Sequence, residues 1–497
     1  MYSLNIDTPQ YNNYNTVKSV GVSHVSKPIA QASVPAFTAG NPQMTQVPYN
    51  KALTASRLRT ELSSSDEKEK YNTLLKVLDR DSKKRLNTLL KTGALLNSDS
   101  NDNSTTLDNL YKIATADRAQ GLDSVTILKD TIHTIYDPHT ITQQFGNIPA
   151  QYQSQAQAVA GDKAGDVNVE HSGTCVASSI EYNLADKHPA EFARFAEGLS
   201  SPNMSVQKTI KMNNLADNTL DAIWLLNAFE IPYSAKDFNK AELTFAPDKN
   251  AIIRAHIQTV DRDKYERSSL DVLMQSTFMQ IGSQQSYDSL TDKREGKFNQ
   301  NDKGLIEFEK TFTESVVEDK NKMSVTYQTV DENGRLVGYE TDFNTMKKQI
   351  TDALKLGDNV IIGYTQVDAN NTIINGHEIT ITGTRTDKNG KMTFICNDTD
   401  DNVSKAVEYS EDFLLPKIHH AALPQSVVAD DVNLVENWVE GLKTYKEMKK
   451  QTQNVNAQQI VAQPVQHSIP QQVVMQPQNS TPAGTIVLER NQIGQVA

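Results

Sequence analysis

The stretch 346–402 restricts most strongly what this chain can fold into. Apolar residues at helical spacing predict a helix over 346–356, and Gly357 follows at a position where helices commonly end. The apolar run NVIIGYT at 359–365 then predicts a short buried strand. A helix, a buried strand and a further β-hairpin in this order are typical of an α+β fold.

The hairpin brings polar residues together. Strict alternation in HEITITGT predicts a strand that begins at His377, and turn residues at 387–390 lead into a returning strand, KMTFICN. The end of the returning strand, Asn397 and Asp398, must therefore lie beside His377. An amide or carboxylate there can accept the imidazole N–H and hold the ring in the tautomer that serves a thiol.

A cysteine at the predicted start of a helix is the candidate nucleophile. The segment SGTCVASSIEYNL predicts a helix that opens at Thr174 or Cys175. The positive end of a helix dipole lowers the pKa of a thiol and favours the nucleophilic thiolate. The apolar stripe of this helix is formed by Val176, Ile180 and Leu184. We therefore expect Cys175 to face a polar surface, although a small buried cysteine is the simpler alternative.

The order of these residues resembles that of papain-like cysteine peptidases, especially the bacterial type with a peptidase C39-like fold. The resemblance implies Cys175 as the nucleophile, His377 as the general base, and Asn397 or Asp398 as the orienting residue. The papain pattern favours Asn397, whereas the C39-like pattern favours Asp398. We lean towards Asp398, because a carboxylate stabilises an imidazolium by its charge.

The resemblance is incomplete in front of the cysteine. The neighbours of the cysteine are Thr174 and Val176, which differ from the papain pattern. That family also uses an upstream glutamine as an oxyanion donor, and no glutamine occurs between Gln157 and Cys175. Asn168 offers a carboxamide seven residues before the cysteine and is the candidate replacement.

The predicted architecture is an α+β, papain-like fold, a helical subdomain plus an antiparallel sheet, with an all-helical N-terminal extension and disordered tails. Residues 1–50 contain five prolines and only three charged residues, and residues 451–497 contain twelve glutamines and only two charged residues. Neither composition supports a packed core. The predicted segments are a tail at 1–50, a helical extension at 51–149, a linker at 150–167, the papain-like domain at 168–425 with an insertion at about 200–340, a helix at 430–450 and a Gln-rich tail at 451–497.

Composition excludes several classes of function. The net charge of −12 argues against nucleic-acid binding, because phosphate contacts need a surplus of lysine and arginine. The sequence contains no run of 18 apolar residues, so we expect no transmembrane helix. Two cysteines fit a reducing compartment, and the first residues, MYSLNIDTPQ, lack the features of a Sec signal peptide. We expect a cytoplasmic protein, or one exported without such a signal.

Other segments carry weaker signals. The run AIIRAHIQTV at 251–260 predicts a strand, and His419-His420 is expected to be a surface pair. Cys396 alternates with apolar neighbours and is expected in the core. We find no motif for a metal or for another cofactor.

Two functions follow from the sequence. The first is a thiol-dependent hydrolase or acyltransferase that acts on peptide or isopeptide bonds of a peptide or protein substrate. The second is a catalytically inactive papain-like fold that serves as a protein-interaction module. Its insertion or its Gln-rich tail would then bind a protein partner.

Overall fold

The computed structural model describes residues 58–144, 148, 154, 173–211, 226–234, 240–260, 262, 266–294, 304–331, 333–400, 405–428 and 438. All of them fall within the unit formed by residues 1–449. The predicted tails, most of the predicted linker and most of the predicted helix at 430–450 lie outside the described residues, as does Asn168. The described part has a mixed α+β fold with antiparallel sheets.

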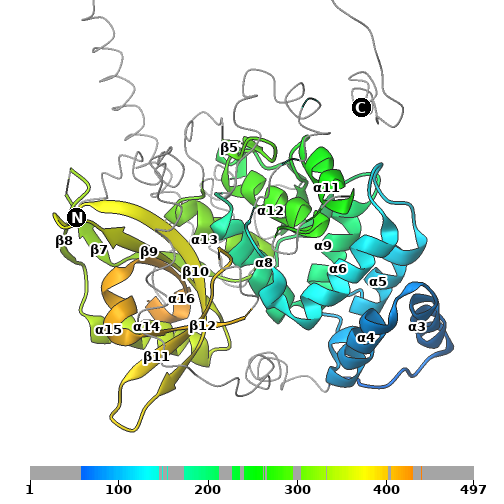
Figure 1. The fold of residues 1–497 in the computed structure, drawn as a ribbon, viewed down its shortest axis with the longest axis horizontal. Helices are drawn as coiled ribbons and strands as arrows, with labels where there is room; N and C mark the ends of the chain where they lie inside the picture. The colour runs from blue at the N-terminus through cyan, green and yellow to red at the C-terminus, as the bar shows by residue number, and fades with distance from the viewer. Residues whose placement is uncertain are drawn as a thin grey trace, which may run out of the picture. The chain divides into compact units, whose positions relative to one another are not determined.

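Helices dominate the first part of the described chain (Figure 1). They are α3 (Ser65–Val77), α4 (Arg80–Thr92), α5 (Thr106–Thr115), α6 (Ser124–Tyr136), α8 (Cys175–Lys187), α9 (Pro189–Ser200), α11 (Ala251–Val260), α12 (Ser269–Gly282) and α13 (Glu307–Glu318). Short polar side chains begin several of them. Ser64, Thr105 and Ser268 each form a capping box with the acidic residue three positions later, at the starts of α3, α5 and α12.

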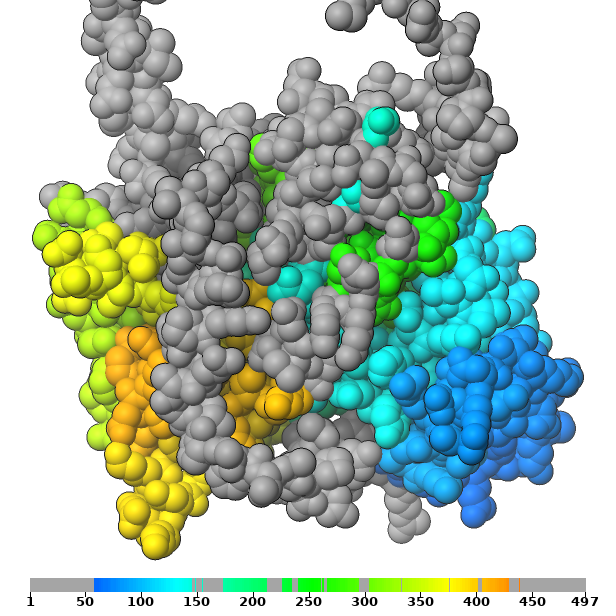
Figure 2. Space-filling view, viewed as in Figure 1, coloured from blue at the N-terminus to red at the C-terminus, as the bar shows by residue number. Residues whose placement is uncertain are grey.

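These helices share one hydrophobic core, which extends from Leu74 in α3 to Trp438. Helix α5 packs on α9, and α6 contacts α8, α9 and α12. In Figure 2 the blue and cyan residues of α3 to α6 adjoin on the same side of the molecule. The predicted helical extension and the helix that carries Cys175 are therefore parts of one packed body.

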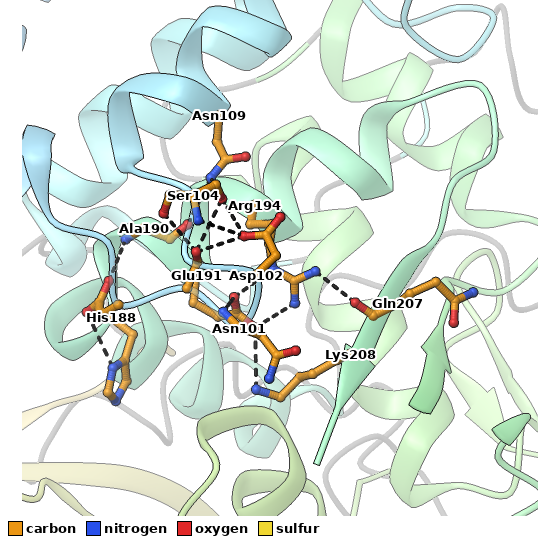
Figure 3. A network of polar contacts seen from close by, with 12 residues as sticks. Asn101, Asp102, Ser104, Asn109, His188, Ala190, Glu191, Arg194, Gln207 and Lys208 are labelled. Carbon is orange, nitrogen blue, oxygen red and sulfur yellow. Dashed lines mark hydrogen bonds and ion pairs between the residues drawn. The ribbon is translucent and has the colours of Figure 1, made fainter. Parts of the chain in front are cut away.

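A buried ionic network ties the beginning of α9 to its surroundings (Figure 3). Glu191 accepts two hydrogen bonds of 2.7 Å from the guanidinium of Arg194, and one of 2.8 Å from the backbone N–H of Asn101. Lys208, in strand β1 (Val206–Thr209), lies 3.4 Å from the same carboxylate. Every charge in this network has an opposite charge beside it, which burial of ions requires.

The main sheet has six strands in the order β12-β11-β10-β9-β13-β6, and all neighbours are antiparallel. The strands are β6 (Lys322–Thr326), β9 (Val360–Val367), β10 (Ile373–Thr386), β11 (Met392–Asn397), β12 (Val407–Ser410) and β13 (Ile418–Pro424). A three-stranded sheet has β3 (Glu242–Phe245) in the middle, between β1 and β2 (Tyr233–Ser234). Two further sheets have two strands each: β4 (Tyr287–Asp288) with β5 (Lys293–Arg294), and β7 (Gln328–Val330) with β8 (Leu336–Tyr339).

Helices cover both faces of this sheet. Ile361 of β9 belongs to the helical core, whereas its neighbour Ile362 belongs to a second core with Ile350 of α14 (Phe343–Lys355). Consecutive strand residues point to opposite faces, so the two cores lie on opposite sides of the sheet. Helices α8 and α13 contact the strands from the side of the helical core.

The helix, the buried strand and the hairpin predicted between 346 and 397 are confirmed, although β10 begins at Ile373, four residues before the predicted start at His377. Helix α14 ends before Gly357, whose φ of +91° suits a glycine, and the hairpin of β10 and β11 turns at Gly390, with φ of +81°. The segment 200–340, expected as an insertion, contributes β6 to the main sheet and α12 and α13 to the helical core. No helix in the described ranges has the length and apolar character needed to cross a bilayer.

The prediction of a strand at 251–260 is wrong. These residues form α11, and its buried positions include Ala251, Arg254, Ala255 and Gln258. This spacing is that of one helical face, and Ile253 and Ile257 pack in a small cluster with Ile148 and Leu290. Tertiary packing here overrides the local preference of β-branched residues.

A stacked pair of aromatic rings marks the centre of the helical core. Phe312 lies 4.3 Å from Phe229, ring centroid to centroid, and meets Trp438 edge-on at 5.4 Å. We predict that Phe312→Ala lowers the free energy of unfolding by about 3–5 kcal/mol, because it removes a fully buried ring and leaves a cavity. Urea denaturation of both proteins measures the difference.

The matched control is Phe343→Ala, since Phe343 is 36% exposed at the start of α14. We expect it to change the free energy of unfolding by less than about 1 kcal/mol. Equal losses in the two variants would contradict the assignment of Phe312 to the core.

Candidate active site

The helix α8 presents Cys175 at its first position, and the rest of the helix is buried from Val176 to Lys187. Cys175 itself is only half-buried. The expectation that Cys175 shares an exposed polar face of this helix is wrong, because Ser178, Ser179 and Tyr182, on the same side of the helix, are all buried. Cys175 keeps partial exposure because it stands at the end of a buried helix, not because it lies on an exposed helical face.

The segment before the cysteine is held on both sides. The backbone N–H of Gly173 donates a hydrogen bond of 2.5 Å to Asp292 Oδ2, and the hydroxyl of Tyr287 donates to the other oxygen of that carboxylate. The hydroxyl of Thr174 donates to Gln275 Oε1 at 2.8 Å. These contacts fix the position at which α8 begins.

Gln275 of α12 links α8 to Thr142, which lies just after the N-terminal helices. Its amide Nε2 donates to the backbone oxygen of Thr142 at 2.9 Å and to Glu181 Oε2 at 3.1 Å. Burial and the neighbouring Asp271 raise the pKa of Glu181 well above its ordinary value. A protonated Glu181 avoids an uncompensated charge beneath the cysteine helix.

His377 contacts Asp398 and interacts electrostatically with Cys175, the other two members of the predicted triad. Its Nε2 lies 2.7 Å from Asp398 Oδ1, and both side chains are nearly buried. Burial lowers the pKa of His377, but the charge of Asp398, the hydrogen bond with Asp398 and a hydrogen bond with Cys175 raise it well above the ordinary value. Since Asp398 occupies Nε2, the nitrogen that can serve the thiol is Nδ1.

Asn397 has a different partner. Its Oδ1 lies 2.9 Å from Nδ1 of His139, and His139 packs against the ring of Tyr182 in α8. Asn397 is the last residue of β11 and Asp398 follows it outside the strand, and the two side chains contact different histidines. Of the two candidates for orienting His377, Asp398 contacts its imidazole. Asn397 instead contacts His139.

A short segment of the N-terminal region holds the loop after β11. Residues 141–144 follow the 3₁₀ helix η3 (Pro138–Thr140), and we call them the strap. Gln143 of the strap donates from its backbone N–H to Thr399 O at 2.9 Å, and the Thr142 hydroxyl donates to the same oxygen at 3.1 Å. The Thr399 hydroxyl in turn pairs with Ser178 of α8 at 2.7 Å.

The sequence analysis missed the strap and Gln275. Both lie far from the triad along the chain, and no motif connects them to it. The polar run Thr142-Gln143-Gln144 directly after a helical region was the only local signal. Asn168, the candidate oxyanion donor, cannot be placed among the described residues, and its role stays a prediction.

Two further expectations concern residues outside the triad. Cys396 is fully buried in the second core, as expected. The prediction that His419-His420 is a surface pair is wrong, because each residue is only 1% exposed.

No family model, no curated protein and no solved structure matches this chain. The resemblance to papain-like peptidases therefore stays an expectation from the sequence.

The contact between His377 and Asp398 has a consequence that titration detects. We predict that Asp398→Asn lowers the pKa of His377, because the variant removes the charge that stabilises the imidazolium. The wild-type ring should hold its proton well above pH 6.5, and the variant should release it at lower pH. NMR titration of the imidazole Cε1–H signal measures both values.

Asn397→Ala is the control for this titration, because Asn397 contacts His139 and not His377. Its His377 should titrate like that of the wild type. A larger shift in Asn397→Ala than in Asp398→Asn would show that the orienting residue has been chosen wrongly.

Proposed function

We propose that this protein is a thiol-dependent hydrolase or acyltransferase that acts on peptide or isopeptide bonds. The observation that carries the proposal is His377, which interacts with the Cys175 thiol while Asp398 holds its Nε2 at 2.7 Å. A cysteine, an imidazole and a carboxylate in this order form the arrangement that activates a thiol for attack on a carbonyl.

The reaction would proceed in two steps. The proton of the Cys175 thiol passes to Nδ1 of His377, and the thiolate attacks the carbonyl carbon of the substrate. The imidazolium then protonates the leaving amine, the C–N bond breaks, and a thioester with Cys175 remains. Attack by water on the thioester releases an acid, and attack by another amine transfers the acyl group; either step frees the thiol.

Other residues support this chemistry. Asp398 stabilises the imidazolium that forms in the first step, and its position depends on the neighbouring Thr399. The negative oxygen of the tetrahedral intermediate would lie near the first turn of α8, whose backbone N–H groups have no acceptor within the helix. The N–H of Cys175 is the nearest of these groups to the reacting sulfur.

The direct test is covalent labelling of the thiol. We expect iodoacetamide and an epoxide-type thiol-protease probe to modify Cys175 at neutral pH, with the site mapped by mass spectrometry. Cys396 is an internal control, because burial and the charge of Asp398 raise the pKa of its thiol well above the ordinary value. Cys175 should react at least about 100-fold faster than Cys396.

His377→Ala should slow the labelling of Cys175 by about 100-fold or more if the imidazole acts as the base. A Cys175 that labels no faster than Cys396 in the folded wild type would reject the catalytic proposal. That result would favour the non-catalytic interaction module instead.

The two orienting candidates give a second comparison. We predict that Asp398→Ala slows probe labelling of Cys175 by about 100-fold, whereas Asn397→Ala slows it far less. The reason is that Asp398 contacts the imidazole and Asn397 contacts His139. Circular dichroism of each variant checks that the fold is intact, and equal losses in two folded variants would reject the role given to Asp398.

A further inference from the structure

A second cluster of polar residues is buried between α13 and the main sheet. His419 and His420 are consecutive residues of β13, so their side chains would ordinarily point to opposite faces. The pairing of β13 with β9 shifts register between Ile418 and His420. Such a bulge redirects side chains, and here the two rings lie 5.3 Å apart, centroid to centroid.

Three atoms converge in this cluster: Glu307 Oε1, His419 Nε2 and His420 Nδ1. The carboxylate oxygen lies 2.9 Å from His419 Nε2 and 3.8 Å from His420 Nδ1. All three are buried, and none makes a hydrogen bond of good geometry with a described residue. Ligand atoms around a tetrahedral zinc ion are about 3.3 Å apart, since each metal–ligand bond is about 2.0–2.1 Å long.

Outer contacts leave a lone pair of each histidine facing the other two atoms. The amide nitrogen of Gln328 donates to Pro416 O, so its Oε1 is the atom that faces His419 Nδ1, at 3.2 Å. His419 therefore carries its proton on Nδ1, and its Nε2 can bind a metal. An amide or carboxylate on the outer nitrogen is the usual support of a metal-binding histidine.

His420 has the same kind of support from the other side. Its Nε2 lies 3.0 Å from Glu378 Oε1, and Lys310 lies 3.0 Å from the second oxygen of that carboxylate. This contact is an ion-pair distance without good hydrogen-bond geometry, but a carboxylate so close to Nε2 favours the proton on that nitrogen and leaves Nδ1 for a metal. Glu307 is oriented likewise, because its Oε2 accepts a hydrogen bond of 2.8 Å from the hydroxyl of Thr326.

The backbone of β9 makes room for this arrangement at Gly363. A Cβ atom there would lie 2.4 Å from His420 Cε1 and 2.7 Å from Glu378 Oε1. Both distances are far below van der Waals contact. The cluster therefore requires a glycine at this position, although Gly363 needs no unusual φ.

We propose that Glu307, His419 and His420 bind one divalent metal ion of the zinc class. Two imidazole nitrogens and one carboxylate oxygen are ligands that zinc takes in three-ligand sites, with water in the fourth position. The proposal is independent of the function assigned to Cys175. Bound metal would join α13 to β13, and through Glu378 it would stiffen β10 next to His377.

The test is metal analysis of the full-length chain, purified without a histidine tag and equilibrated with buffered Zn²⁺. We expect about one zinc ion per chain by mass spectrometry of the metal, and a higher melting temperature with zinc than after treatment with a chelator. Cobalt in place of zinc should give the visible absorption of a four-coordinate site. A folded wild type that binds no zinc and shows no such shift overturns the proposal.

Variants locate the ion. Glu307→Gln and His419→Gln should lose the bound zinc, and Gln328→Ala should weaken zinc affinity about 10- to 100-fold through the loss of outer support. His133→Gln, on the half-buried side of α6, should keep it. Cys175→Ser should also keep it, and loss of zinc in Cys175→Ser would place the ion at the thiol and overturn the proposal. Full zinc content in His419→Gln would overturn it equally.

Discussion

The candidate site depends on how the loop after β11 is fixed. Thr399 is bound by the strap through its backbone oxygen and by Ser178 of α8 through its hydroxyl. The preceding residue, Asp398, is thereby placed where its carboxylate meets His377. A carboxylate on a free loop would lose conformational entropy each time it oriented an imidazole, and these hydrogen bonds remove that cost in advance.

Burial of α8 leaves only its first residue, Cys175, partly exposed. Helix α8 lies inside the helical core over nearly its full length, and only its first residue is partly accessible. A buried helix leaves its polar side chains in need of partners, which Gln275 and Thr399 supply. The structure thus combines a buried, hydrogen-bonded helix with a partly exposed cysteine at its first position.

What the sequence could reveal was mostly local. Turn residues and strict alternation set the hairpin of β10 and β11, so the neighbourhood of His377 and Asp398 followed from spacing alone. The helix at 251–260 was misread because local preference and periodicity disagreed there and packing decided. The amphipathic reading of α8 failed for a related reason, since a helix buried on all sides has no exposed polar face to identify.

Long-range contacts could not be predicted in the same way. Glu307 and His419 are separated by more than a hundred residues, and only the bulge in β13 turns both histidines towards the carboxylate. The strap is likewise remote from Thr399 along the chain. Such contacts depend on the assembled sheet and helices, and no spacing rule within one segment encodes them.

The shared core also restricts which gene segments could carry the candidate site from one protein to another by recombination. Helices α5 and α6 pack on α8, α9 and α12, and the strap that follows them holds the loop beside Asp398. A gene fragment that began at Cys175 would encode the nucleophile, the base and Asp398, but not the strap that holds the loop after β11. A gene segment that transferred an intact site would therefore have to include the N-terminal helices and the strap as well as the segment from Cys175 onwards.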